Sequence, residues 1–192
     1  PNARFTSPGG LQYPHARTVA TYKWDCTVRA RIKSIDFRTL KVPMTGRAEL
    51  NMSRGHPNWC ISEICIVSDD AGNSGFGETL PHYTWGRPDR ERAGSLLDSN
   101  PFDHLWDDSL GSGVQMALWD LAGKLADAPC HRLLGRSVRD EIPIAWWCMD
   151  MPAEQWAAEA EQAVKSGYTA MKIKARPWFD LDAQLTAISA AT

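Results

Sequence analysis

The chain of 192 residues is long enough for one ordinary domain and part of a second, since domains cluster near about 100 to 150 residues. Its formal net charge of −2 and isoelectric point near 6.2 argue against nucleic acid or an anionic membrane as a partner. No apolar run approaches the roughly 18 residues that a membrane span needs. These properties favour a role with small molecules.

The five cysteines are scattered and odd in number, and they never form the C-x-x-C pairs of structural zinc sites. This usage predicts reduced thiols and a cytoplasmic location. His56 and Cys60 are close enough in sequence to suggest a pair of metal ligands. Without further partners, they are better explained as a loop histidine and a buried thiol.

The N-terminal part of the chain changes character near Thr27. Residues 1–26 are rich in Pro, Gly, Ser and Thr and show no periodicity, which predicts an irregular arm. Apolar and basic residues then alternate over residues 28–33 with the period of two of a half-buried strand, and Pro43 ends that strand. Residues 44–58 have the composition of a loop.

A β-hairpin is predicted next, with a strand over residues 59–67, a turn at residues 69–72 and a return segment. Three glycines in this region, Gly72, Gly75 and Gly77, are not spaced as G-x-G-x-x-G, and no helix opens directly after them. Turn chemistry therefore explains these glycines better than nucleotide binding.

The longest predicted helix is SGVQMALWDLAGKLAD, residues 112–127. Its apolar residues recur at helical spacing from Val114 to Leu125 and form one continuous stripe, and Pro129 stops the helix. We expect this stripe to pack against a large apolar surface.

A strand, a helix and a second strand are predicted after residue 128, over residues 142–147, 151–167 and 169–175. The helix has Pro near its first turn and Gly just past its end, as helix boundaries often do. This order predicts a βαβ unit, and such units build parallel sheets whose outer face is covered by helices.

The last strand carries two lysines. Because side chains alternate along a strand, Lys172, Lys174 and Arg176 would share one face. In a barrel that face points inward, near the strand ends where barrel enzymes hold their active sites. Two partly desolvated ammonium groups about 7 Å apart disfavour each other's charge, so one of them can accept a proton. An exposed edge strand with solvated lysines fits the spacing equally well.

Three segments, SGVQMALWDLAGK, LLG and MKIK, follow one another as in the mandelate racemase and muconate lactonizing enzyme family of the enolase superfamily. The chain resembles this family from about Val28 to its end. The resemblance implies an α+β capping domain over residues 27–127. It implies that residues 128–192 form the first βαβ part of a truncated (β/α)7β TIM-like barrel.

The resemblance also suggests which segments approach the substrate. Residues 44–58 look like a flexible cap loop, and residues 77–83 look like a second loop that reaches the site. Arg47 and His56 are then candidates for substrate binding, with a solvated loop position as the alternative for each. Arg176 is a third candidate, because its guanidinium group suits a polyhydroxy acid.

Relatives in this family remove the proton α to a carboxylate and hold the resulting enolate on Mg2+. The resemblance gives Lys174 the role of the base and Lys172 the role of the neighbour that tunes it. The acidic metal ligands are expected on barrel strands beyond Thr192, so no metal ligand is assigned within the chain. The sequence ARPW, residues 175–178, departs from the family, because many relatives carry a glycine there.

The implied function of the full-length parent is that of a Mg2+-dependent acid-sugar dehydratase, which acts on a small carboxylate substrate and forms a homo-oligomer. A racemase or epimerase of 2-hydroxy acids, or a cycloisomerase of the same family, is the alternative. The 192 residues alone are expected to be inactive, because two strands cannot close a barrel. A non-catalytic truncated protein that binds a partner through its unpaired strand edge is the alternative of another class.

Overall fold

The structure, a computed structural model, describes residues 29–53, 55–83 and 86–192. The predicted irregular arm over residues 1–26 lies outside these ranges, as does Val28 in the predicted first strand. Within the described ranges, no helix is long and apolar enough to cross a membrane.

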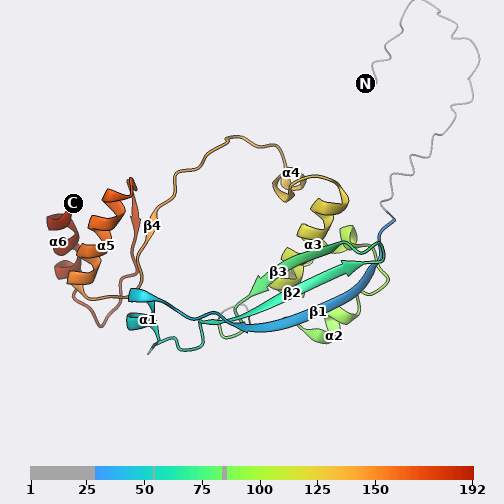
Figure 1. Ribbon diagram of the computed structural model, residues 1–192, viewed down its shortest axis with the longest axis horizontal. Coiled ribbons are helices and arrows are strands. Elements are labelled where there is room, and N and C mark those ends of the chain that lie inside the picture. Colours follow the sequence, from blue (N-terminus) through green and yellow to red (C-terminus); the bar gives the residue numbers. More distant parts are fainter. Residues whose placement is uncertain (1–28, 54, 84–85) are drawn as a thin grey trace, which may run out of the picture.

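Two packed groups of elements are joined by an extended stretch of chain (Figure 1). The first group is a three-stranded antiparallel sheet with one long helix across a face, and the second is a parallel pair of short strands with two helices. The first group contains β1 (Ile32–Lys41), β2 (Ile61–Asp69), β3 (Ser74–Thr79), α2 (Arg90–Gly94), η1 (Pro101–His104), η2 (Asp108–Leu110), α3 (Ser112–Leu125) and α4 (Cys130–Leu134). The second contains β4 (Trp146–Trp147), α5 (Ala153–Lys165), β5 (Met171–Lys172) and α6 (Leu181–Ala191).

The predicted first strand is confirmed within the described residues. Ala30 and Ile32 are buried while Arg31 is exposed, as the alternation predicts. The free edge of β1 is tied down at its start, because the Ile32 amide donates to the Ser99 carbonyl at 3.0 Å and the Asp98 amide donates to the Ile32 carbonyl at 2.9 Å. The sheet is thereby joined to the chain that follows α2.

The predicted hairpin is also confirmed, because β2 and β3 pair antiparallel. The Asp69 carboxylate builds the turn by accepting hydrogen bonds from the backbone amides of Ala71 at 3.0 Å and Asn73 at 2.7 Å. Gly72 has a φ of +91°, a conformation that other residues rarely adopt. One of the three glycines therefore serves the turn, as predicted.

The other two glycines have a different role, and the prediction of turn chemistry is wrong for them. Gly75 and Gly77 lie within β3 and face α3. A Cβ atom on Gly75 would lie 2.0 Å from the Ala117 carbonyl oxygen, and one on Gly77 would lie 2.0 Å from that of Gly113. Their missing side chains let the helix backbone lie directly on the strand.

The long helix is confirmed as α3, and its apolar stripe fills the core of the first group. Each fully buried Leu or Val side chain contributes about 1.5–3 kcal/mol relative to exposure. The α3 residues of this stripe that are fully buried, with 0% exposure, are Val114, Ala117, Leu118, Leu121 and Ala122. They pack against Ile32, Cys65 and Val67 of the sheet.

The predicted βαβ unit is confirmed, with Trp146 opposite Met171 and Trp147 opposite Lys172 in parallel register. Met171 packs into a second core that is formed by Cys148, Met151 and Trp156 and lies under α5 and α6. Both strands are shorter than predicted. β4 covers only Trp146–Trp147 of the predicted residues 142–147, and β5 covers only Met171–Lys172 of the predicted residues 169–175. Its ladder includes the bond from the Cys148 amide to the Lys172 carbonyl at 2.8 Å.

A helix forms where a loop was predicted. Residues 44–58 read as a loop, but Gly46–Met52 form the short helix α1, which lies beside the second group (Figure 1). The segment Ala48, Glu49 and Leu50 consists of good helix formers. Met52 is buried and holds the end of the helix in place.

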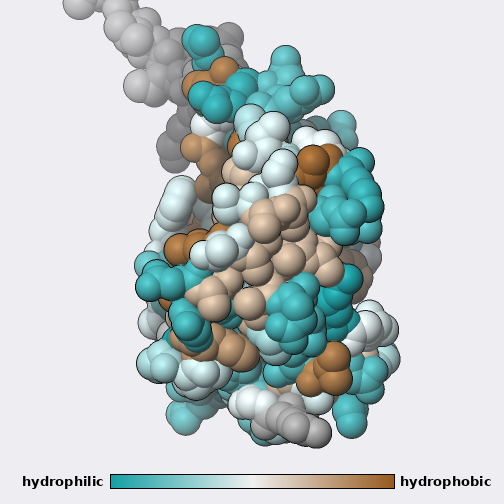
Figure 2. Space-filling view, turned by 90° about the vertical axis from the view of Figure 1, so that its left-hand side faces the viewer, coloured by the Kyte–Doolittle hydropathy of each residue, from teal (hydrophilic) through white to brown (hydrophobic). Residues whose placement is uncertain are grey.

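The outer face of the second group is mixed in character. Seen from that side, apolar surface (brown) runs between hydrophilic patches (teal) (Figure 2). Exposed apolar side chains of the helix region include Val164 at 52% and Leu185 at 44%. The exposed faces of α5 and α6 are therefore not uniformly polar.

Cys65 in the first core and Cys148 in the second are fully buried. Burial, and secondarily the neighbouring carboxylate of Glu63 or Glu159, raises the pKa of each thiol from 9.0 to about 12. Because the folded state keeps these protons while the unfolded state loses them near pH 9, the free energy of unfolding should fall as pH rises from 9 toward 12. Urea denaturation at pH values below and above 9 measures this slope.

The matched control is the double variant Cys65→Ala and Cys148→Ala, which lacks both titrating thiols. Its stability should fall less steeply over the same alkaline range. Equal slopes for the two proteins would contradict the prediction.

Candidate functional site

Three segments that are distant in sequence meet around one indole ring. The His56 ring stacks on Trp59, with centroids 4.2 Å apart and 16° between the planes. Tyr83 meets Trp59 edge-on at 5.0 Å, and Lys174 Nζ lies 5.3 Å from the Trp59 ring centroid. We call His56, Trp59, Tyr83 and Lys174 the Trp59 cluster. The cluster brings together the predicted cap loop, the predicted second loop and one lysine of the predicted pair.

Tight turns place the aromatic residues of the cluster. The His56 amide donates to the Met52 carbonyl at 2.7 Å, and the Trp59 amide donates to the His56 carbonyl at 3.1 Å. Rings three residues apart in such a turn can lie against each other. A further turn, from the Tyr83 amide to the Leu80 carbonyl at 3.1 Å, sets the position of Tyr83.

The two lysines of the K-x-K sequence lie in different surroundings. Lys172 lies in β5 and is exposed, whereas the preceding Met171 packs against the second core. The predicted alternation of faces is therefore confirmed for Met171 and Lys172. Lys174 lies beyond the end of β5, is partly buried and contacts the Trp59 ring. The prediction that Lys174 and Lys172 are catalytic stays a prediction.

Arg176 is held by an ion pair. Its Nε donates to Asp150 Oδ2 at 2.7 Å, and both side chains are largely buried. The guanidinium also lies 5.5 Å from the Trp178 ring centroid. Because Asp150 follows β4 and Arg176 follows β5, this pair joins the segments after the two strands. The predicted contact of Arg176 with substrate stays a prediction.

Arg47 lies on α1 and pairs with Glu159 of α5. The second oxygen of Glu159 accepts a hydrogen bond from Trp146 Nε1 at 2.7 Å, and Asn51 Nδ2 donates to Gln155 Oε1 at 2.7 Å. These contacts dock α1 on α5. Arg47 is thus part of this docking contact, separate from the Trp59 cluster, and its predicted role in substrate binding stays a prediction.

We expect Arg47→Glu to loosen this docking, because two carboxylates would then face each other. The rate of proteolysis within residues 44–53 should rise about 3- to 10-fold. Limited proteolysis followed by mass spectrometry measures it. Combining Arg47→Glu with Glu159→Arg should restore part of the protection.

The control for that experiment is Lys165→Glu, which makes the same charge change at an exposed pair. Lys165 Nζ and Glu161 Oε1 are 2.8 Å apart, and both side chains are more than half exposed. The cleavage rate within residues 44–53 should not change in this variant. A similar rise in both variants would show that net charge, not docking, controls cleavage.

The described residues do not fit a metal ion by themselves. Over residues 29–53, 55–83 and 86–192, no three His, Cys, Asp or Glu side chains are arranged as a possible metal site. Asp150, in the segment that follows β4, is already paired with Arg176.

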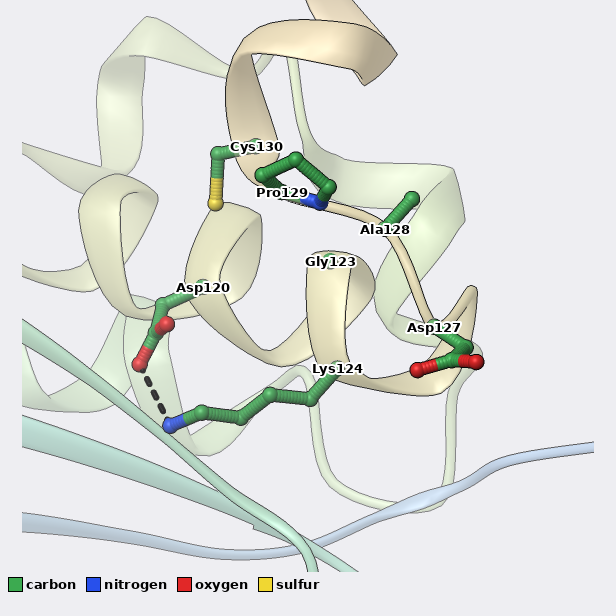
Figure 3. Close-up of a pocket in the computed structure, with 7 residues that line it drawn as sticks. All are labelled: Asp120, Gly123, Lys124, Asp127, Ala128, Pro129 and Cys130. Carbon is green, nitrogen blue, oxygen red and sulfur yellow. Dashed lines mark hydrogen bonds and ion pairs between the residues drawn. The ribbon is translucent and has the colours of Figure 1, made fainter.

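A hollow of about 350 Å³ lies at the C-terminal end of α3 and the turn into α4 (Figure 3). Of the charged side chains that line it, Asp120 and Lys124 point toward each other, with Oδ2 and Nζ 2.8 Å apart. The same groups bind β3, since Asp120 Oδ2 accepts from the Phe76 amide at 2.8 Å and Lys124 Nζ donates to the Ser74 carbonyl at 2.6 Å. These charges tie the strand to the helix, which favours a structural role for this hollow.

Comparison with curated proteins finds enzyme relatives. No profile of a known protein family matches the chain. A D-xylonate dehydratase of Haloferax volcanii is 35% identical over 163 residues, which cover 70% of this chain and 36% of that enzyme. Other curated relatives are named as acid-sugar dehydratases or as a chloromuconate cycloisomerase. The sequence relatives are therefore lyases and isomerases.

Solved structures share the fold. A dipeptide epimerase of Methylococcus capsulatus, solved with a Mg ion, matches with a TM-score of 0.63 and 20% identity over 84% of this chain and 48% of that one. A mandelate racemase/muconate lactonizing protein of Herpetosiphon aurantiacus matches with a TM-score of 0.61 and 20% identity over 84% and 49%. The chain thus spans about half the length of these structures.

Proposed function

Because the chain is a relative of the mandelate racemase and muconate lactonizing enzyme family within the enolase superfamily, we propose that it forms part of an enzyme that removes the proton α to a carboxylate. Residues 27–127 are its cap and residues 128–192 begin its barrel. The observation that carries the proposal is the contact between Lys174 and the cap residue Trp59. This contact joins the candidate base to the two segments predicted to cover the substrate.

The reaction that the relatives favour is dehydration of an acid sugar. Lys174 accepts the α-proton, and the electron pair of the broken C–H bond forms a double bond to the β-carbon. The β-hydroxyl leaves as water, taking up a proton from a general acid of the enzyme, so the products are an enol and one water molecule. The enol then becomes a 2-keto-3-deoxy acid.

The cationic neighbours of the base have distinct roles in this proposal. Lys174 supplies the amine that accepts the α-proton. Lys172 attracts the substrate carboxylate in this proposal. His56 and Tyr83 supply aromatic surface that excludes water from this side of the site.

Mg2+, when bound in enzymes of this kind, stabilises the negative charge that develops on the substrate. A structural neighbour was solved with this ion. The described residues offer no set of three side chains that could hold this ion.

A turnover assay tests the proposal. The protein is expressed from its full reading frame and incubated with a panel of acid sugars and Mg2+ in D2O. Formation of a 2-keto-3-deoxy acid, detected as a ketone, supports the dehydratase. Deuterium at the α-carbon without loss of water would instead indicate a racemase or epimerase. Absence of both products across the panel would overturn the proposal.

The isolated 192 residues give a second comparison. We expect no turnover from them under the same conditions, because two strands cannot enclose a substrate. Turnover of an acid sugar by the 192-residue chain would contradict this expectation.

A further inference from the structure

We propose that Trp59 is a positioning residue for Lys174, holding its ammonium group from the side of the cap. The assignment of Lys174 as a base rests on the proposed function, but the contact itself does not. Trp59 lies one residue beyond the predicted cap loop, and the sequence pattern places it at the start of a strand. In the structure it precedes β2, which begins at Ile61.

The geometry suits an attraction between a cation and a ring. Lys174 Nζ lies 5.3 Å from the centroid of the Trp59 ring, within the roughly 6 Å over which such contacts act. Tryptophan has the most favourable ring for this contact. Both side chains are partly buried, so the contact is shielded from water on some sides. The indole can thus restrict where the flexible lysine side chain points.

The ring is itself held in place from two directions. His56 covers one face as a stacked neighbour, and Tyr83 meets the indole at 81° between planes. These residues come from segments on either side of the β2–β3 hairpin. An indole ring that is packed from two sides keeps a fixed orientation. The Lys174 side chain in contact with it is therefore restricted to fewer conformations.

The contact also matches the charge change of a base. When Lys174 accepts a proton it becomes a cation, and the negative face of the indole attracts that charge. Because Trp59 comes from the cap part of the chain, the alignment of Lys174 depends on the position of the cap.

A nuclear magnetic resonance measurement tests the contact directly. The lysines of the protein expressed from its full reading frame are labelled with 13C-methyl groups, and Lys174→Arg assigns the Lys174 signal. The ring current of Trp59 should shift this signal upfield. The shift should disappear in Trp59→Ala and persist, reduced, in Trp59→Phe. A Lys174 signal that does not move in Trp59→Ala would overturn the proposal.

The chain supplies a matched control. Lys124 Nζ lies 4.8 Å from the Phe76 ring centroid, a second pair of the same kind on the sheet. Phe76→Ala should move the Lys124 signal and leave that of Lys174 in place. Movement of both signals in each variant would mean that the variants disturb the whole fold, and the positioning role would then have no support.

Kinetics separate this proposal from the proposed function. With an active enzyme, Trp59→Ala should lower kcat about 10-fold with KM changed less than about 2-fold, and Trp59→Phe should recover most of the rate. An unchanged kcat in Trp59→Ala would overturn the positioning role. If the unaltered protein has no activity, the proposed function fails, and the resonance measurement alone decides whether Trp59 holds Lys174.

Discussion

Lys174→Met is expected to stop removal of the α-proton in the protein expressed from its full reading frame. Methionine keeps the apolar stem that lies against Trp59 but has no amine to accept a proton. General base catalysis supplies about 100- to 10,000-fold, so kcat should fall by at least about 100-fold. The rate of deuterium incorporation or of ketone formation in D2O measures the loss.

A lysine remote from the cluster provides the control for this variant. Lys165→Met removes an exposed lysine at the end of α5, and we expect the rate to stay within about 2-fold of the unaltered enzyme. Retention of more than a tenth of the rate in Lys174→Met would show that another group is the base. Lys172→Met is expected to reduce the rate less and to raise KM, because it weakens attraction to the substrate carboxylate.

Gly77→Ala should have the largest effect on stability. The added Cβ would lie 2.0 Å from the Gly113 carbonyl oxygen and 2.7 Å from the Ala117 amide nitrogen. Both are backbone atoms of α3, so the whole helix must move away from β3 to make room. We expect the free energy of unfolding to fall by at least about 3 kcal/mol, as in severe overpacking. Urea denaturation followed by tryptophan fluorescence measures this loss.

Gly94→Ala is the matched control, because a Cβ on Gly94 would meet no atom within 4 Å. Gly94 lies in α2, where alanine is favoured over glycine by about 0.5–1 kcal/mol. This variant should be as stable as the original protein or slightly more stable. Equal stability of Gly77→Ala and the original protein would mean that α3 can move freely on the sheet.

The elements that could be predicted from the sequence are those with a long periodic signal. The helix over residues 112–127 and the hairpin after residue 59 each bury one regular face, so their patterns are unambiguous. The role of Gly77 could not be read in the same way. In the sequence, Gly77 belongs to a group of closely spaced glycines, which is typical of a turn. Its close approach to Gly113 exists only when α3 packs on β3.

The short helix α1 and the end of β5 show a second limit. Helices of seven residues are set by their surroundings more than by their composition, and α1 is held by contacts with α5. The alternation in MKIK predicts a strand through Lys174, but the paired region ends at Lys172. The alternation of residue types in the sequence shows which side chains share a face of a strand. It does not show how many residues of that strand form hydrogen bonds with a neighbouring strand.

The candidate site was predictable as a set of segments but not as a set of contacts. The K-x-K sequence and the two loops were identified from the resemblance, and His56 does lie near Lys174 through Trp59. The partners of Arg47 and Arg176 could not be foreseen, because Glu159 and Asp150 meet them only in the folded chain. Trp59 was missed because its position at the start of the predicted strand gives no sign that the Lys174 side chain contacts its ring in the folded chain.

The hydrogen bonds between α3 and β3 also bear on how the protein behaves at high concentration. β3 is an outer strand, and the outward-facing amide of Phe76 and carbonyl of Ser74 are bound by Asp120 and Lys124. An outer strand whose donors and acceptors are open can recruit a strand from another molecule and start aggregation. The charged side chains of α3 occupy two of these positions. They thereby disfavour pairing of the β3 edge with a strand from another copy of the protein.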